Sequence, residues 1–330
     1  MDRSMRAAVA STPDSPFEIQ TYPRPIPGPG EVLVRIAASG VNPLDTKIHA
    51  AAAPHARQPL PAVLGLDLAG TVEAVGEGVT RFRAGDAVYG MTGGVGGIQG
   101  TLAEFASVDA DLLAPKPTNL SMREAAALPL VAITAWEGLV DRMAVSDGQT
   151  VLIQGGAGGV GHIAIQLARS FGAKVFATGS AASRPLIEQL GATFVDRYEP
   201  VQDTVARHTG GQGFDRVFDT AGGAALDASF VAVGEFGHVA SALGWGTHAL
   251  APLSFKGASY SGVFTLAPLL SGKRRRHHGE ILERVAALVE VGTIRPVLFS
   301  EIFTLATVDA AYSAVKTGAT RGKVVVDITE

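Results

Sequence analysis

A run of glycines between Gln154 and His162 carries the clearest chemistry in the sequence. It contains the spacing G-x-G-x-x-G at Gly156, Gly158 and Gly161, directly after an apolar stretch and before an amphipathic one. In such a turn the first glycine permits the sharp bend, the second lets a pyrophosphate approach the backbone, and the third lets helix and strand pack closely. The run therefore predicts a dinucleotide site, with a purely structural glycine turn as the alternative.

The end of the next predicted strand distinguishes between the two nicotinamide cofactors. A carboxylate there would bind the ribose 2′-hydroxyl of NAD and repel the 2′-phosphate of NADP. No acid occurs between Ala177 and Glu188, whereas Ser180 can donate a hydrogen bond and Arg184 a charge-assisted one. We therefore predict NADPH as the cofactor, and the alternative that Arg184 merely faces solvent stays open.

The elements that must position these residues form an alternating series from about Arg123 onward. Apolar strand runs alternate with amphipathic helices, which is typical of a doubly wound parallel sheet. The predicted strands cover 150–153, 174–177, 193–195, 216–219 and 237–241, and the predicted helices cover 159–171, 184–190 and 201–208. The first of these helices would open with Gly159 and Val160, whose backbone N–H groups would face the phosphates.

The residues before Arg123 predict a β-rich domain, because short apolar runs alternate with glycine and proline turns. After about Phe255 we expect a helix over 279–291 and strands over 298–303 and 323–328, the last of which rejoins this first domain. The sequence thus predicts two domains. Residues 1–122 plus 256–330 form a β-rich substrate domain, and residues 123–255 form the dinucleotide-binding domain.

Composition excludes several classes of function. Of the 330 residues 47% are hydrophobic, with a mean hydropathy of +0.25, which is typical of a globular protein with a large core. The net charge of −4 gives no long-range attraction for nucleic acid or anionic lipid, so a small-molecule partner is expected. No segment reaches the ~18 apolar residues of a membrane span and the start has no signal-peptide stretch, so we expect a cytoplasmic protein. The basic run 273–276, followed by His277 and His278, is expected to be a solvated loop.

Several further segments match one family together. They are 38–45 (ASGVNPLD), 64–70 (LGLDLAG), 74–79 (AVGEGV), 83–88 (RAGDAV) and 128–139 (LPLVAITAWEGL). With the glycine run, they make the chain similar nearly end to end to the medium-chain dehydrogenase/reductase superfamily, and within it to the zinc-free quinone oxidoreductases and the alkenal and enone reductases. This resemblance implies an α/β fold in which a Rossmann-type doubly wound parallel sheet is inserted into a β-rich, GroES-like catalytic domain.

The zinc-bearing members of that superfamily carry Cys where Asn42 stands and His-Glu where Leu66 and Asp67 stand. Cysteine is absent from the sequence, and only Asp67 of these three residues could coordinate zinc, so we predict no metal site. Without a Lewis acid the acceptor must be intrinsically electrophilic, as quinones and α,β-unsaturated carbonyls are. We predict NADPH-dependent quinone reduction. Reduction of alkenals or enones, and NADPH binding without turnover, are the alternatives.

The resemblance also implies site residues. The catalytic set is Asn42, Asp45 and Thr134. The resemblance adds Tyr198, Ser241 and Phe264 to the cofactor set, which already contains the glycine run, Ser180 and Arg184. Asn42 and Thr134 would lie beside the nicotinamide ribose and ring, Tyr198 on the adenine side, and Ser241 and Phe264 near the carboxamide. A structural alternative exists for each motif residue, such as a turn cap for Asn42 or a surface ring for Tyr198.

Two properties depend on the resemblance alone. Relatives pair the edge strands of their cofactor domains, which implies a homodimer with residues 258–263 as the candidate edge. The proton donor is not identified, because His49 and Ala51 to Ala53 stand where the family often has a tyrosine or arginine.

Overall fold

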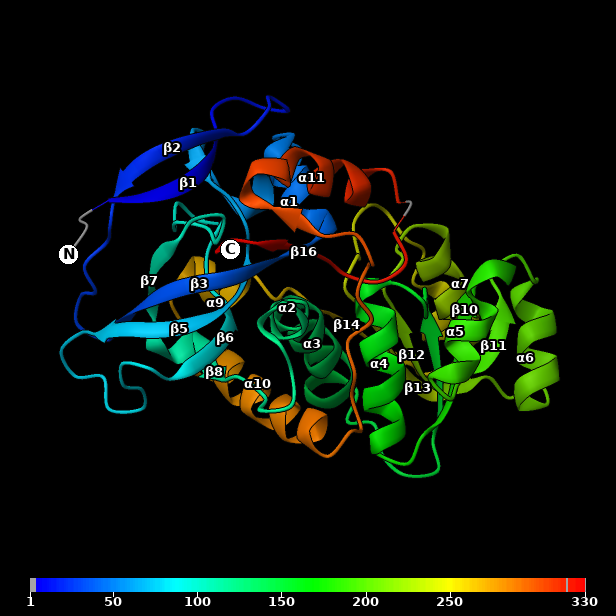
Figure 1. Cartoon of the computed structure of the whole chain (residues 1–330). Coiled ribbons are helices and arrows are strands. Elements are labelled where there is room, and N and C mark those ends of the chain that lie inside the picture. The colour runs from blue at the N-terminus through cyan, green and yellow to red at the C-terminus, as the bar shows by residue number, and fades with distance from the viewer. Residues whose placement is uncertain (1–3, 319, 330) are drawn as a thin grey trace. The chain divides into compact units, whose positions relative to one another are not determined.

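The computed structural model describes residues 4–318 and 320–329, which form two compact units (Figure 1). The β-rich unit comprises Met1–Leu130, Leu266–Gly292 and Pro296–Glu330, and the parallel-sheet unit comprises Val131–Thr265 and Thr293–Arg295. The chain therefore passes from one unit to the other at 130/131 and back at 265/266, where the sequence prediction has 122/123 and 255/256, and it returns briefly to the parallel-sheet unit at 293–295.

A seven-stranded sheet forms the centre of the β-rich unit. Its strands follow in the order β15-β16-β3-β5-β6-β8, and β7 also pairs with β3. Their bounds are β3 Glu31–Val41, β5 Asp67–Val75, β6 Ala87–Met91, β7 Phe105–Asp109, β8 Leu113–Pro115, β15 Phe303–Thr304 and β16 Val324–Asp327. A smaller sheet has the order β2-β1-β4, with β1 Ser4–Ala10, β2 Glu18–Pro23 and β4 Ala62–Val63.

The long strand β3 organises this unit, because it pairs antiparallel with β5, β7 and β16. Its apolar side chains Val32, Val34 and Ile36 are fully buried, as alternation along a strand requires. Near its end Gly40 lets a helix come very close, since a Cβ there would lie 2.2 Å from the carbonyl oxygen of Ala126. The end of β3 is therefore enclosed by protein.

The helices of the β-rich unit are short, except for α10. They are α1 Pro43–His49, α2 Met122–Ala126, α9 Ala267–Ser271, α10 Arg275–Glu290 and α11 Val308–Lys316. At the C-terminal end β16 lies beside β3 (Figure 1), so the last strand rejoins the β-rich unit, as predicted. The strand predicted over 298–303 was wrong: Leu298 makes only an isolated bridge with Lys323, and regular pairing with β16 begins at Phe303.

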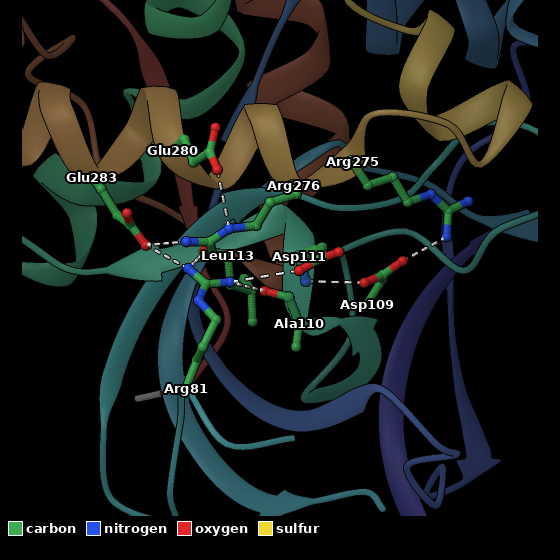
Figure 2. A network of polar contacts seen from close by, with 9 residues as sticks. All are labelled: Arg81, Asp109, Ala110, Asp111, Leu113, Arg275, Arg276, Glu280 and Glu283. Atoms are coloured by element: carbon green, nitrogen blue, oxygen red, sulfur yellow. Dashed lines mark hydrogen bonds and ion pairs between the residues drawn. The ribbon is translucent and has the colours of Figure 1, made fainter. Parts of the chain in front are cut away.

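The basic run is a solvated loop only in its first half, because Lys273 and Arg274 are exposed and precede α10. Arg275 and Arg276 already belong to α10. The Arg275 guanidinium lies 3.0 Å from Asp109, while Arg276 lies 3.4 Å from Glu280 and 3.5 Å from Glu283 (Figure 2). Arg276 thus pairs with carboxylates of its own helix, whereas the partner of Arg275 is distant in sequence.

Arg81 completes this network from the other side. Its Nη2 lies 2.5 Å from Glu283 Oε1, and its Nη1 donates to the carbonyl oxygen of Ala110 at 3.0 Å (Figure 2). Partly exposed ion pairs each contribute little alone, but together they attach α10 to the connection between β7 and β8.

The parallel-sheet unit is the doubly wound sheet that the sequence predicts. Its strand order is β11-β10-β9-β12-β13-β14, and every neighbouring pair is parallel. The bounds are β9 Thr150–Gln154, β10 Lys174–Gly179, β11 Thr193–Asp196, β12 Phe214–Asp219, β13 Val233–Ser241 and β14 Ser259–Gly262. The order reverses between β9 and β12, and ligands of such sheets bind at that reversal, outside the carboxyl ends of the strands.

Helices connect the strands of this sheet. They include α4 Gly159–Ser170, α5 Arg184–Gln189, α6 Val201–Thr209, α7 Ala224–Ala232 and α8 Ala251–Ser254, while α3 Pro129–Trp136 crosses the unit boundary and continues as a π-helix over Glu137–Arg142. The core includes Leu152, Phe214 and Phe230, and burying a side chain of this size contributes roughly 1.5–3 kcal/mol. Among the described helices, none has the length and apolar character needed to cross a bilayer.

Candidate functional site

The glycine run forms a tight turn between β9 and α4, as predicted. Gly158 is the N-cap of α4, and among the described residues no side chain caps this helix end, so its first backbone N–H groups, at Gly159 and Val160, point outward without a capping partner there. A Cβ on Gly161 would lie 2.1 Å from the carbonyl oxygen of Gly155, so only glycine lets the helix pack this close to the strand end. An uncapped helix N-terminus at the carboxyl edge of the sheet is a site for an anion.

Two polar side chains that sequence reasoning missed hold this turn. Thr178, at the end of β10, donates its hydroxyl to Gln154 Oε1 at 2.8 Å and accepts the N–H of Gly155 at 3.0 Å. The backbone N–H of Gly156 donates to the carbonyl oxygen of Thr178 at 2.9 Å. The turn is thus fixed to both β9 and β10 before any ligand arrives.

Ser180 and Arg184 follow the end of β10, where the prediction needs them. The Ser180 hydroxyl lies 3.4 Å from that of Ser183. The Arg184 guanidinium stacks over the Phe194 ring at 4.2 Å and lies 3.6 Å from Glu188, while about half of the side chain stays exposed. Two neighbours therefore contact the Arg184 guanidinium, and about half of the side chain remains accessible to solvent.

Tyr198 and its neighbour Arg197 lie at the same end of the sheet. The backbone N–H of Arg197 donates to the carbonyl oxygen of Gly179 at 3.0 Å, which places it against the last residue of β10. Its Nη2 donates to the Tyr198 hydroxyl at 2.7 Å, and Tyr198 is 77% exposed. A surface pocket of about 470 Å³ is lined by Arg184, Tyr198 and Arg207, among others. Arg197 was missed, although an arginine directly after a strand end was a visible signal.

Ser241 and Phe264 occupy the far side of the same edge. Ser241 ends β13 and donates its hydroxyl to Asp219 Oδ2 at 2.6 Å, and Asp219 Oδ1 also accepts the N–H of Gly222 at 2.9 Å. Phe264 is 37% exposed and makes an edge contact with Trp245. Fully buried Asp219 therefore fixes the ends of β12 and β13, a role that the sequence analysis did not assign.

The three predicted catalytic residues divide between the two units. Thr134 lies on α3 in the parallel-sheet unit and is 4% exposed. Asn42 and Asp45 lie together in the β-rich unit, where Asn42 is the N-cap of α1 and its backbone N–H donates to Asp45 Oδ2 at 2.7 Å. His49, at the end of α1, bonds the carbonyl oxygen of Ser15 at 2.8 Å and stacks on Phe17.

Asn42 is part of a buried polar network that includes Asp67 and Lys323. Its Nδ2 donates to Asp67 Oδ2 at 2.9 Å, and the Lys323 ammonium donates to its Oδ1. Lys323 also donates to the carbonyl oxygen of Val41 at 3.1 Å, and the N–H of Leu130 donates to Asp67 Oδ1 at 2.9 Å. The sequence analysis did not assign Lys323, although a lysine directly before the apolar run 324–326 was a visible signal.

Burial changes the proton affinities of this network. It raises the pKa of Asp45 to about 7 and that of Asp67 to about 6, because a carboxylate loses its hydration there. Burial lowers the pKa of Lys323, although the two carboxylates oppose this. Asp45 Oδ1 and the Tyr312 hydroxyl, both buried, have no hydrogen-bond partner among the described residues. The network thus holds more acids than bases in a dry environment.

Two family models match the chain. The alcohol dehydrogenase GroES-like domain matches residues 28–118, and the zinc-binding dehydrogenase model matches residues 190–326. The structure of an alcohol dehydrogenase superfamily protein from Novosphingobium aromaticivorans has 58% sequence identity and a TM-score of 0.97, covering 98% of this chain and 100% of that one.

Two curated relatives have distinct activities in their names. A chloroplastic NADPH-dependent alkenal/one oxidoreductase of Arabidopsis thaliana is 34% identical, over 90% of this chain and 72% of that protein. A quinone oxidoreductase of Sus scrofa is 32% identical, over 83% and 82% respectively. The chain belongs to the medium-chain dehydrogenase/reductase superfamily, which confirms the resemblance and the predicted fold class.

Proposed function

We propose that this protein reduces conjugated carbonyl compounds with NADPH, and that a quinone is its acceptor. The observation that carries the proposal is the uncapped N-terminus of α4 above the glycine turn, at the point where the strand order reverses. Backbone N–H groups aimed outward from such a turn suit a pyrophosphate.

The residues along the sheet edge fit a nicotinamide dinucleotide. Gly158 to Gly161 would hold the pyrophosphate. Ser180, Arg184 and Tyr198 would hold the phosphorylated ribose and adenine, and Ser241 and Phe264 the nicotinamide end. From β10 to β13 the sheet advances three strand spacings, about 14 Å. That separation suits an extended dinucleotide that crosses the edge.

The preference for NADPH over NADH has its support in charge. No carboxylate ends β10. The Arg184 guanidinium lies over the ring of Phe194 in β11 and Arg197 directly follows β11, while Asp196 and Glu199 line the same pocket as Arg184. A 2′-phosphate would gain charge-assisted hydrogen bonds from either guanidinium. The name of the Arabidopsis relative includes the same cofactor.

The chemistry of Asn42 and Thr134 indicates which class of acceptor the site would reduce. The bound cofactor would supply a hydride, and in a conjugated carbonyl the negative charge then develops on oxygen. Asn42 has an amide N–H that can donate to such an oxygen, as can the hydroxyl of Thr134. A quinone and an enone meet the same requirement.

Enone or alkenal reduction is the second candidate, and the name of the Arabidopsis relative favours it. Binding of NADPH without turnover is the third, and the net charge of −4 gives it little support as a nucleic-acid-associated function. The cytoplasmic location stays a prediction of the sequence.

Oxidation of NADPH, followed at 340 nm with a quinone panel and an enone panel, tests the proposal. We expect turnover with at least one quinone. Turnover with enones alone would replace the first candidate by the second. Binding of NADPH with no turnover on either panel would contradict the proposed reaction.

Homodimer formation through β14 also remains a proposal. β14 is the edge strand of the six-stranded sheet, and an edge strand leaves a row of backbone groups available for pairing with another chain. Light scattering should give the mass of two chains at micromolar concentration, and a monomer alone would contradict this.

A further inference from the structure

Three strand ends bring Asn42, Asp67 and Lys323 to one place in the β-rich unit. In the register of the sheet, Gly40 pairs with Asp67 and Val41 pairs with Val324. The residue after β3, the first residue of β5 and the residue before β16 therefore meet, although they are far apart in sequence. Asn42 is 1% exposed, Asp67 0% and Lys323 4%, so water cannot substitute for any of their contacts.

The Asn42 amide lies between the two charges. Lys323 Nζ and Asp67 Oδ2 are 3.9 Å apart, which is beyond hydrogen-bond distance. Both groups instead bond the amide: the ammonium donates to Oδ1, and the carboxylate accepts from Nδ2. If the two charged groups served only to neutralise each other, they would be expected to bond directly.

This arrangement specifies which way the amide faces. An ammonium can only donate a hydrogen bond and a carboxylate can only accept one. Rotation of the amide by 180° would turn its NH₂ group toward the ammonium and its oxygen toward the carboxylate, which costs two hydrogen bonds in a dry site. The amide nitrogen and the amide oxygen of Asn42 therefore each have a fixed direction.

We propose that Lys323 and Asp67 are positioning residues that hold the Asn42 amide in a single orientation. Neither acts on a ligand itself. The effect on catalysis rests on the proposed function, in which Asn42 faces the nicotinamide ribose or the acceptor oxygen. The positioning itself does not depend on it, and it can be tested in the protein without cofactor.

The sequence makes a direct test available, because Asn42 and Asn119 are its only asparagines. Protein labelled with ¹⁵N-asparagine should give two pairs of side-chain NH₂ signals. Asn119, whose Nδ2 donates to the carbonyl oxygen of Val289 at 3.0 Å, is the internal reference. In the wild type we expect slow solvent exchange of the Asn42 amide protons.

The Lys323→Met variant should shift the Asn42 signals and accelerate their exchange at least tenfold, while Asn119 stays unchanged. Lys323→Arg, which keeps a donor and the charge, should restore much of the protection. Unchanged Asn42 signals in Lys323→Met would overturn the proposal.

A buried carboxylate left without its cation can prevent folding. The double variant Lys323→Met/Asp67→Leu removes both charges and keeps two asparagines, so it serves where the single variant does not fold. An Asn42 amide that stays protected in this folded double variant would also overturn the proposal.

A mutant cycle tests whether the two residues act through Asn42. We expect Asn42→Ala to lower kcat/KM by about 10- to 100-fold, as loss of an oriented group does. The double variant Lys323→Met/Asp67→Leu should lower kcat/KM by a similar factor. Combining it with Asn42→Ala should lower kcat/KM little further. Losses that multiply would contradict the positioning role.

Fluorescence titration measures the NADPH affinity of the same variants, which is a readout that does not depend on turnover. Lys316→Met, which removes an exposed lysine paired with Asp14, is the matched control and should leave both quantities unchanged. If the wild type reduces neither quinones nor enones, the proposed function fails, while the amide signals still decide whether Asn42 is positioned as inferred.

Discussion

The phosphate turn of the parallel-sheet unit and the Asn42 network of the β-rich unit are built in opposite ways. The turn is made of backbone N–H groups within one strand–turn–helix connection, and glycine is needed because a side chain would fill the space. The network is made of side chains from three strand ends, with Lys323 separated from Asn42 by 281 positions. A site made of backbone tolerates variation in nearby side chains, whereas a buried side-chain site depends on each partner.

The largest expected effect tests the backbone site. In Gly158→Val the new Cβ would meet only the carbonyl oxygen of Gly155, at 3.2 Å, so the chain should fold with a small loss of stability. The added branches would occupy the approach of the pyrophosphate, and NADPH affinity should fall more than ~100-fold. Titration calorimetry measures this, and unchanged affinity would place the pyrophosphate elsewhere.

Gly161→Val is the contrasting variant at the same turn. Its Cβ would lie 2.1 Å from the carbonyl oxygen of Gly155 and 2.8 Å from the Cα of Gly156. It should therefore lower the melting temperature strongly, which separates the packing glycine from the ligand-facing one.

Arg184→Ala should have the next largest effect. A charge-assisted hydrogen bond contributes about 1.5–3 kcal/mol, so NADPH should bind ~10- to 100-fold more weakly, with NADH nearly unaffected. The matched variant is Arg197→Ala, because its backbone bonds the end of β10 and its guanidinium is exposed beside Tyr198. A selective loss in Arg197→Ala alone would transfer the phosphate-binding role to Arg197, and equal losses for both cofactors would indicate a structural role.

The buried network predicts a pH effect on stability. The pKa of Asp45 is raised to about 7 by burial, whereas the unfolded chain releases this proton near 3.8. The folded state therefore binds more protons between about pH 4 and 7, so the free energy of unfolding falls as pH rises through that window. Between pH 6 and 8 the folded protein loses most of the proton on Asp45. The free energy of unfolding should therefore fall by on the order of 1.4 kcal/mol, the equivalent of one pKa unit.

Asp45→Asn should reduce this fall, since the replacement amide oxygen can still accept the backbone N–H of Asn42. Denaturant unfolding at pH 6 and 8 measures it. Asp215→Asn, at an exposed carboxylate that accepts the N–H of Thr150, should keep the wild-type dependence. An unchanged dependence in Asp45→Asn would show that Asp45 does not carry the effect.

The smallest expected effect is that of chelation. Asn42 and Asp67 bond each other, and the Lys323 ammonium 3.9 Å from Asp67 would repel a metal cation. Purified protein should contain no stoichiometric zinc and keep its activity in a chelator. Elemental analysis that finds one zinc per chain, lost together with activity, would contradict this.

Local patterns were sufficient for most of the parallel-sheet unit, although α7 was not predicted. The glycine spacing predicted the turn and the start of α4 at Gly159, because both depend on backbone space within a few residues. The strand and helix alternation predicted the parallel sheet, since each element buries its own apolar face. The second half of the basic run after Gly272 was interpreted wrongly, because Arg275 and Arg276 begin α10 and the partner of Arg275 is Asp109, which is distant in sequence.

The sequence by itself determined the superfamily, the doubly wound sheet and the phosphate turn, since these follow from the spacing of glycines and apolar residues. Only the tertiary structure decided that Lys323 and Asp67 hold the Asn42 amide, and that Arg197 lies against the end of β10. The physical reason is that strand register, set by many pairings along β3, β5 and β16, decides which distant side chains are buried together.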